Sequence, residues 1–503
     1  MESLFSNLAL GFSVAGTPAN LFYCFVGAML GTLIGVLPGI GPLATLAMLL
    51  PITFTLPPEG ALIMLAGIFY GAQYGGSTTS ILINVPGESS SVVTALDGHA
   101  MAKQGRAGSA LAIAAIGSFF AGCVSTVAIA VAGPPLASIA QKFGAAEYFS
   151  LMLFGLVGAV VLASGSVLKA VAMIVLGLLL GLIGLDVTSG HGRYTFGIPE
   201  LADGLGFVTV SLGLFGIAEI MTNLERAGKE GRDDIAPVHS LMPTRKDLRE
   251  SWPAILRGTG VGTLLGILPG GGAVLASFSA YTLEKKMAKD PSRFGKGAIE
   301  GVAGPEAANN AAAQSSFIPM LTLGIPSNAV MALMIGAMMI QGITPGPQVM
   351  TKQPALFWGI VASMWIGNLM LVIINLPLVG IWIRLLRVPY DMMFPAIIVF
   401  CSIGIYSLNN SATDVLFTAG FGVLGYLFVK LGFEAAPLLL GFVLGPLMEE
   451  NLRRAMVMSR GNAMTFLERP ISCGLLIASL LLLLIVVAPS VRRTREEAFQ
   501  EET

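Results

Sequence analysis

Two polar stretches lie inside otherwise apolar sequence, and their residue types suit anion binding. One runs from Tyr74-Gly-Gly-Ser-Thr-Thr to Asn84-Val-Pro-Gly-Glu, and the other runs from Gly304-Pro-Glu-Ala-Ala-Asn-Asn to Gly324-Ile-Pro-Ser-Asn. Proline cannot continue a helix and glycine weakens one by about 1 kcal/mol, so each stretch predicts a broken helix. A helix that restarts after such a break exposes unpaired N–H groups and the positive end of its dipole. These features bind an anion without arginine.

We therefore expect these breaks, and the glycine-proline turns described below, to form a substrate site. Their backbone carbonyls and side-chain oxygens could equally hold Na⁺, with no particular ligands assigned. The alternative is that small residues only allow close helix contact, but matched breaks in two halves favour a site. The candidate substrate-binding residues are Pro38, Gly39, Gly75, Gly76, Ser77, Thr78, Thr79, Asn84, Pro86, Gly87, Gly270, Gly271, Asn309, Asn310, Ser315, Gly324, Pro326, Ser327 and Asn328.

Glu306 is the one acid in the second stretch, and an acid in or near a membrane span is a candidate for ion coupling. The alternative is that it caps a helix at the membrane interface. His99, His191 and His239 lie far apart without metal-ligand spacing, so we expect solvated loop positions for them. The sequence contains neither a phosphate-binding loop nor a GxSxG nucleophile motif, and we expect no catalytic residue and no cofactor.

The composition places these stretches in a membrane. Hydrophobic residues make up 54% of the 503 residues and charged residues only 11%, against about 25% charged in soluble chains. A net charge of −1 leaves no basic surplus for nucleic acid. Long apolar runs, in place of ten-residue alternation, favour helices over a β-barrel. We therefore expect an all-α polytopic membrane protein with about 12–14 hydrophobic segments.

An internal repeat divides the chain. GTLIGVLPGIG at 31–41 and GTLLGILPGGG at 262–272 share eight of eleven residues. Duplication with paired breaks is typical of secondary transporters, so we expect two homologous, inverted repeats that meet at the substrate site. The predicted parts are a first repeat at 1–223, a charged and cytoplasmic linker at 224–250, a second repeat at 251–490 and a charged tail at 491–503.

The second copy of this motif lies between basic flanks. Basic residues at both ends place both ends on the cytoplasmic side, so the segment must enter the membrane and return. Its legs at 254–267 and 273–283 rise only roughly 21 and 17 Å, which predicts a re-entrant hairpin. Residues 19–57 are its expected counterpart, although two full spans remain an alternative there. The charge rule does not decide the side of the C-terminus.

Four long motifs together resemble the TctA family, the large membrane subunit of tripartite tricarboxylate transporters. They are GVLPGIGPLATLAMLLP (35–51), YGGSTTSILINVPGESSSVVTALDGHAMAKQG (74–105), GILPGGGAVLASFSAY (266–281) and GPEAANNAAAQSSFIPMLTLGIPSNAVMALMIGA (304–337). The resemblance covers nearly the whole chain. It implies a bacterial inner-membrane symporter for citrate-like or other carboxylates, which works with a small membrane subunit and a periplasmic solute-binding protein.

Some choices stay open at this point. The coupling ion is Na⁺ or H⁺, and neither the particular carboxylate nor assembly as a homo-oligomer is decided. A passive channel for small anions is the alternative function, and a membrane-embedded enzyme is a weaker one.

Overall fold

The computed structural model describes residues 2–37, 40–162, 166–186, 189–227, 237–238, 240–268, 272–386 and 390–487. Across these ranges the chain is mostly helical, and its single sheet is the antiparallel hairpin of β1 (Gly184–Leu185) and β2 (Gly192–Arg193). Five helices are long and apolar enough to cross a membrane, and seven shorter apolar helices accompany them. The predicted all-α, multi-pass membrane architecture is thus confirmed. The β hairpin is an addition that the hydrophobic runs do not predict.

The helices follow one another along the chain with short connections. Before the linker they are α1 (Glu2–Ala15), α2 (Pro18–Gly35), α3 (Pro42–Leu49), η1 (Leu50–Thr55), α4 (Pro58–Ile83), η2 (Ser89–Ser91), α5 (Val92–Met101), η3 (Ala102–Arg106), α6 (Ala107–Ala140), α7 (Ala145–Leu162), α8 (Val167–Gly181), η4 (Pro199–Leu201), α9 (Phe207–Ser211), η5 (Leu212–Ile217) and α10 (Ala218–Ala227). After the linker they are α11 (Arg245–Ile267), α12 (Gly272–Met287), η6 (Pro291–Arg293), α13 (Glu300–Ser315), α14 (Phe317–Leu323), α15 (Ala329–Ile340), α16 (Gln348–Lys352), α17 (Pro354–Asn375), α18 (Val379–Leu385), α19 (Tyr390–Asn409), α20 (Ala412–Lys430), α21 (Ala435–Met458), α22 (Thr465–Glu468) and α23 (Pro470–Val487).

Local sequence sets where α2, and α11 after the linker, begin. In α2, Thr17 accepts a hydrogen bond from the Asn20 N–H and Pro18 occupies the first helical position. In α11, Thr244 and Asp247 form a reciprocal capping box, in which each side chain accepts from the other residue's N–H. Capping of this kind stabilises a helix by about 1 kcal/mol.

Glycines allow these two helices to lie directly on a later helix of the same half. An ideal Cβ on three α2 glycines would stand 2.3–2.5 Å from a carbonyl oxygen of α4. On three α11 glycines it would stand 2.1–2.4 Å from a carbonyl oxygen of α13. Side chains at these positions would force the helices apart. Small residues at membrane helix interfaces prevent such a separation. The glycines are Gly27, Gly31 and Gly35 in α2, and Gly258, Gly262 and Gly266 in α11.

The hairpin of α11 and α12 has both ends on one side of the molecule. Arg257 of α11 forms a two-point ion pair with Glu284 of α12, at 2.7 and 2.6 Å. Arg293, beyond α12, lies 3.6 Å from Glu250 near the start of α11. At 1.5 Å per residue the 16 residues of α12 rise about 24 Å, less than the ~30 Å hydrocarbon core. The 23 residues of α11 rise about 35 Å, so this helix is longer than the predicted leg at 254–267. The re-entrant course of the hairpin stays a prediction.

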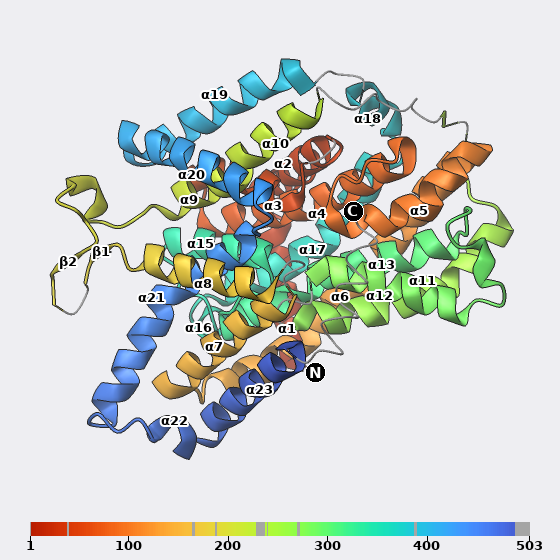
Figure 1. The fold of residues 1–503 in the computed structure, drawn as a ribbon. Helices are drawn as coiled ribbons and strands as arrows, with labels where there is room; N and C mark the ends of the chain where they lie inside the picture. Colours follow the sequence, from red (N-terminus) through yellow and green to blue (C-terminus); the bar gives the residue numbers. More distant parts are fainter. Residues whose placement is uncertain are drawn as a thin grey trace.

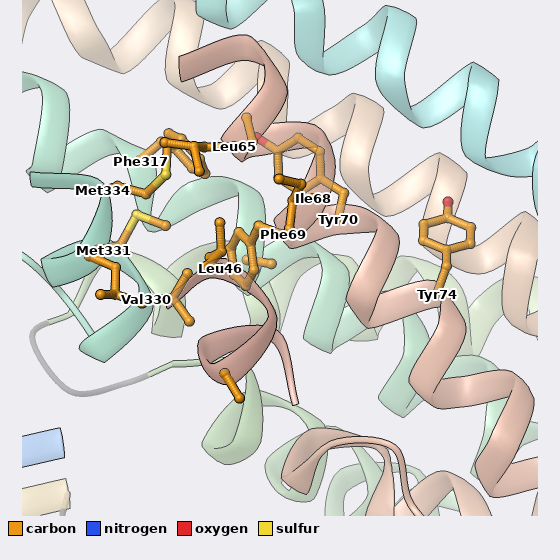
Figure 2. Close-up of a cluster of buried hydrophobic side chains, with 14 of the residues drawn as sticks. Leu46, Leu65, Ile68, Phe69, Tyr70, Tyr74, Phe317, Val330, Met331 and Met334 are labelled. Carbon is orange, nitrogen blue, oxygen red and sulfur yellow. The ribbon is translucent and has the colours of Figure 1, made fainter. Parts of the chain in front are cut away.

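The central helices come from both halves. Figure 1 shows α4, α6, α13 and α17 within the bundle, with the β hairpin projecting from one end. Figure 2 shows aromatic and aliphatic side chains of α4 packed against those of α14 and α15. The rings of Phe69 and Tyr70 lie 6.5 and 5.9 Å from that of Phe317. Burial of such side chains holds two distant parts of the sequence together.

Candidate functional site

The first break follows α4 and the second follows α14, and their backbones match. Asn84 and Gly324 end the preceding helices in the left-handed conformation, with φ of 56° and 73°. A proline follows two residues later in both, and extended Glu88 (φ −150°) and Asn328 (φ −155°) precede the next helical turn. The predicted breaks are therefore present. However, α4 runs unbroken from Tyr74 to Ile83, so the glycines and hydroxyls before Asn84 lie on a helix.

Glu306 is buried where α13 meets helices of the first half. Its side chain is only 1% exposed. Its Oε2 accepts a 2.7 Å hydrogen bond from Ser77 Oγ of α4, and its Oε1 accepts a 2.6 Å bond from Thr94 Oγ1 of α5. Hydroxyl donors, rather than cations, thus satisfy the two carboxylate oxygens. Glu306 lies inside α13, six residues after the first residue of that helix, so it does not cap the helix.

A narrow cavity of about 20 Å³, room for about one water molecule, lies beside this carboxylate. It lies between α4 and α6, which precede the linker, and α13 and α17, which follow it. Oxygen-bearing side chains occupy one wall and aliphatic side chains the other. The lining residues are Tyr74, Ser77, Thr78, Leu111, Ala114, Ala115, Ser118, Glu306, Asn375 and Leu376.

Two of the lining groups lack hydrogen-bond partners. The Tyr74 hydroxyl and Asn375 Oδ1 are both buried, and neither makes a hydrogen bond. Figure 2 shows the Tyr74 ring on α4, to one side of the other labelled side chains. A buried polar atom without a partner costs about 1–3 kcal/mol, so such atoms mark places where a ligand, ion or water binds.

The asparagines of α13 form the layer behind Glu306. Asn310 Nδ2 donates to Ser118 Oγ at 2.8 Å and to the Glu306 carbonyl at 3.1 Å. The Asn310 amide therefore holds α13 against α6 at the level of the carboxylate. The neighbouring Asn309 Oδ1 accepts from Asn310, whereas Asn309 Nδ2 is buried without a partner.

Several predicted site residues of the first half contact the end of α2 instead of the cavity. A Cβ on Gly75 would stand 2.7 Å from the Thr32 carbonyl oxygen, so this glycine allows α4 to pack on α2. Gly87 likewise lies against Gly35 and Gly76. Thr79 Oγ1 donates to the Val36 carbonyl at 3.1 Å. Pro86 lies within the break.

In the second half, the predicted residues beyond Asn310 shape the break and its flanks. A Cβ on Gly324 would stand 2.8 Å from the Pro345 carbonyl oxygen, and its positive φ disfavours side chains as well. Asn328 caps α15, since its Oδ1 accepts from the Met331 N–H at 3.0 Å. Ser327 Oγ is buried without a partner, close to Pro326 in sequence. Ser315 Oγ donates weakly to the Ala312 carbonyl at 3.4 Å.

Of the predicted set, the structure brings Ser77, Thr78 and Glu306 together around the cavity. Pro38, Gly39, Gly270 and Gly271 lie outside the described residues. Sequence reasoning did not select Thr94 or Asn375. The sequence could have indicated Asn375 as a candidate, because an amide at the end of an apolar run must find a polar partner. It does not indicate Thr94, because its partner Glu306 is 212 residues away.

The prediction that His99 is a solvated loop residue is wrong. His99 lies in α5, is 5% exposed, and places Nδ1 3.1 Å from the Ile81 carbonyl oxygen. The error arose because α5 restarts soon after the break, so an apparently polar segment is a buried helix. His191 is exposed as predicted, and His239 lies outside the described residues.

The polar groups that line the cavity are one carboxyl group, several hydroxyl groups and one amide. Its lining contains neither arginine nor lysine. Within the described ranges, no group of three or more histidine, cysteine, aspartate or glutamate side chains could hold a metal ion. A second cavity of about 350 Å³ lies between α8, α15 and α21, but its lining is mainly apolar and lacks hydroxyl donors. The Glu306 cavity is therefore the better site for a polar ligand.

Comparison with known proteins agrees with this architecture. The chain is 60% identical over 502 residues to the "Uncharacterized 52.8 kDa protein in TAR-I ttuC' 3'region" of Agrobacterium vitis, which covers 100% of both chains. It is 61% identical to the "Uncharacterized protein in TAR-II ttuC' 3'region" of the same organism, over 48% of this chain and 100% of that one. No solved structure matches the chain.

The family comparison gives a specific result. The model of the tripartite tricarboxylate transporter TctA family matches residues 21–440, which include both breaks, Glu306 and the whole cavity lining. Membership makes the protein a component of a transport system. The chain belongs to the tripartite tricarboxylate transporter TctA family.

Proposed function

We propose that this chain is the large membrane subunit of a secondary active transporter that imports a tricarboxylate or related carboxylate. The transport is cation-coupled symport across the bacterial inner membrane, with Na⁺ or H⁺ as the coupling ion. A small membrane subunit and a periplasmic solute-binding protein complete the system, as family membership implies. Symport uses the gradient of the coupling cation, so it lets a permease without an ATP site accumulate its substrate.

The observation that carries this proposal is the setting of Glu306. A carboxylate in the membrane core costs free energy, so such a residue is a candidate for binding or coupling. Glu306 receives its two hydrogen bonds from Ser77 and Thr94, in the other half of the chain. Binding of a cation at Glu306 would compete with these hydroxyl contacts, and it would thereby change how the halves are held together. This is the linkage that coupled transport requires.

The substrate site belongs to the same region. We assign substrate contacts to the cavity side chains Ser77 and Thr78 and to the two breaks. The N–H groups that begin the helices after the breaks supply positive charge, each helix end contributing about 0.3–1 kcal/mol and up to ~2 when partly buried. The remaining predicted residues stay part of the proposed substrate site. They are Pro38, Gly39, Gly75, Gly76, Thr79, Asn84, Pro86, Gly87, Gly270, Gly271, Asn309, Asn310, Ser315, Gly324, Pro326, Ser327 and Asn328.

The proposed architecture is a pair of inverted repeats, 1–223 and 251–490, joined by a cytoplasmic linker. Two features support duplication. The α2–α4 and α11–α13 contacts each use three glycines at four-residue spacing, and the two sets are 231 residues apart. The breaks share their backbone conformation at Asn84 and Gly324. Inversion is the relation that would let exchange of conformations between halves open the site to alternate sides.

The test is uptake by proteoliposomes that contain this chain, the small subunit and the solute-binding protein. A panel of labelled carboxylates is offered under separate Na⁺ and H⁺ gradients. The proposal predicts accumulation of one carboxylate class above its external concentration, and collapse of that accumulation when an ionophore dissipates the gradient. Equilibration without accumulation would identify a passive channel, and chemical conversion of the substrate would identify an enzyme. Either result contradicts symport.

A further inference from the structure

The cavity beside Glu306 has room for one small occupant. Its volume of about 20 Å³ accommodates about one water molecule, and a tricarboxylate has many more atoms than that. The oxygen-bearing side chains at its wall therefore surround the same occupant. They come from four helices, and they are Tyr74, Ser77 and Thr78 of α4, Ser118 of α6, Glu306 of α13 and Asn375 of α17.

Hydrogen bonds join three of these helices at the cavity. Ser77 Oγ donates to Glu306 Oε2 at 2.7 Å, and Ser118 Oγ donates to the Glu306 carbonyl oxygen at 3.4 Å. On α4, Tyr74 precedes Ser77 and Thr78 by three and four residues, so the three share one face of the helix. This face carries the Tyr74 side chain to the cavity wall that the carboxylate also lines.

The Asn375 amide is oriented by its nitrogen. Nδ2 donates to the Leu371 carbonyl oxygen at 2.9 Å and to Thr32 Oγ1 at 3.4 Å. The oxygen lies at the other end of the amide and has no hydrogen-bond partner. Tyr74 and Asn375 are only 4% and 5% exposed, and the Tyr74 hydroxyl also lacks a partner. Because an amide oxygen can only accept, a partner for Asn375 Oδ1 in the cavity is a cation or a hydrogen-bond donor.

The charge at the cavity wall favours a cation over an anion. Among the described residues that line the cavity, Glu306 is the one with a charged side chain. Helix α17 ends at Asn375, and the C-terminal end of a helix carries partial negative charge. An anion would meet negative charge from both sources, whereas a cation balances the buried carboxylate.

We propose that Glu306, the Asn375 amide oxygen and the Tyr74 hydroxyl oxygen bind one dehydrated Na⁺ in this cavity. The inference rests on the proposed function and deepens it, because it selects Na⁺ and names two further ligands. A proton needs a single acceptor oxygen. Several converging oxygens are instead the surroundings of a hard metal cation.

The position of this site links Na⁺ to both halves and to the substrate. Tyr74 belongs to α4, before the linker, whereas Glu306 and Asn375 belong to α13 and α17, after it. A cation that all three bind holds the halves in one arrangement. Ser77 and Thr78, to which substrate contacts are assigned above, lie within one turn of Tyr74 on α4.

The chain offers two matched pairs of variants. Tyr74→Phe removes only the hydroxyl group from the cavity. Its control is Tyr70→Phe, because the Tyr70 hydroxyl is also buried on α4 without a partner but does not line the cavity. Asn375→Leu removes the amide. Its control is Asn368→Leu, because the Asn368 amide also donates to the carbonyl four residues earlier and leaves Oδ1 without a partner, outside the cavity.

Na⁺ binding is measured on the purified full chain, without substrate or partner proteins. The thermal unfolding midpoint is followed at constant pH while NaCl replaces choline chloride at constant ionic strength. A cation that binds only the folded protein raises the midpoint by mass action. We expect NaCl to raise the midpoint of the wild type and of both controls. Tyr74→Phe and Asn375→Leu should each need at least tenfold more NaCl for the same rise.

The Tyr74→Phe variant also separates lost binding from lost folding. Without NaCl its midpoint should equal or exceed that of the wild type, because the substitution removes a buried hydroxyl that has no partner. Equal NaCl responses of the two cavity variants and their controls would overturn the site. A wild-type midpoint that does not respond to NaCl would overturn it as well, and the cavity would then hold a water molecule or a proton only.

Uptake by the complete system distinguishes this failure from failure of the proposed function. Gradient-driven carboxylate uptake that persists without Na⁺ binding in the cavity leaves the proposed function intact. Na⁺ binding without gradient-driven uptake of any carboxylate would instead contradict the proposed function.

Discussion

At the scale of single residues, the adjacent glycines Gly75 and Gly76 have different neighbours. A Cβ on Gly75 meets backbone atoms, the Thr32 carbonyl oxygen and the Val36 nitrogen, both at 2.7 Å. Backbone atoms cannot move aside without shifting a helix. A Cβ on Gly76 meets the flexible Glu88 side chain at 3.0 Å, which can move by a few tenths of an ångström. One glycine therefore allows two helices to pack, and the other leaves room for the Glu88 side chain.

Substituting alanine separates the two roles. We expect Gly75→Ala to lower the free energy of unfolding by about 1–3 kcal/mol because it overpacks the α2–α4 contact. Gly76→Ala should keep the unfolding midpoint near that of the wild type but displace Glu88. We expect its carboxylate uptake to fall at least tenfold, the factor given by about 1.4 kcal/mol of lost binding. The two substitutions are compared by thermal unfolding in detergent and by uptake into proteoliposomes. Equal effects of both substitutions on both measurements would contradict the separation of the two roles.

Residue-level prediction from sequence is most specific where one residue type has few options. Glu306 was selected because an acid inside apolar sequence needs a reason to be there. Thr94 and Asn375 escaped selection, because their importance comes from Glu306 and from a cavity between helices distant in sequence. Glu88 stood in the quoted motif beside three serines, where a solvated loop explained it equally well. Only burial distinguishes these cases.

At the scale of elements, the breaks were predictable and the course of α4 was not. Proline disfavours continuation of a helix, and the interruptions at Pro86 and Pro326 agree with this. The interruption predicted at Gly304-Pro305 is absent, because Pro305 lies inside α13. The Gly75-Gly76 pair predicts a weakened helix, but tertiary contact outweighs this cost, because the missing side chains let α2 lie against α4. The hairpin of β1 and β2 escaped prediction since its strands have two residues each.

The left-handed turn at Asn84 gives an element-level prediction. Asparagine tolerates a φ of 56°, glycine adopts it freely, and a β-branched residue resists it. We expect Asn84→Gly to leave the unfolding midpoint within a small margin of the wild type. Asn84→Val should lower the free energy of unfolding by about 1–2 kcal/mol. Thermal unfolding of the purified variants measures the difference, and a valine variant as stable as the glycine variant would show that the turn is not strained.

The glycines of α11 provide a second test with a control on the same helix. A Cβ on Gly262 would stand 2.1 Å from the Ala308 carbonyl oxygen, whereas a Cβ on Gly260 has nothing within 4 Å. We expect Gly262→Ala to lower the free energy of unfolding by about 1–3 kcal/mol through the forced separation of α11 and α13. Gly260→Ala should raise it by roughly 0.5–1 kcal/mol, because alanine favours a helix. Thermal unfolding of both variants measures the difference. A Gly262→Ala variant as stable as the wild type would mean that the contact between α11 and α13 is looser than described.

At the scale of the whole molecule, the site exists only where the two halves meet. Ser77 and Thr94 come from the first half and Glu306 from the second, so neither half alone contains a complete carboxylate environment. The repeat in the sequence predicts such an interface in outline. It cannot predict which faces of α4 and α13 meet, because this depends on packing over the full length of both helices. Transport by movement of one half against the other would alter these contacts directly.

The direction in which the chain crosses the membrane provides the last prediction. One apolar helical run, Phe207–Glu225, separates the β hairpin from the linker, so these two must lie on opposite sides. Basic residues place the linker in the cytoplasm. Both ends of the α11–α12 hairpin should share that side, since Arg293 lies 3.6 Å from Glu250. Single cysteines at Lys246, Lys289 and Ser189, all exposed, can report these sides.

After removal of the four native cysteines, we expect a membrane-impermeant maleimide to label Ser189→Cys in intact spheroplasts, from the periplasmic side. Lys246→Cys and Lys289→Cys should be labelled only in inside-out vesicles. A re-entrant hairpin requires these two to behave alike, because its chain enters and leaves through the same surface. Labelling of Lys246→Cys and Lys289→Cys from opposite sides would show that α11 or α12 crosses the membrane. The second repeat would then have an odd number of crossings in its first pair of helices, and the proposed inverted pairing with residues 19–57 would fail.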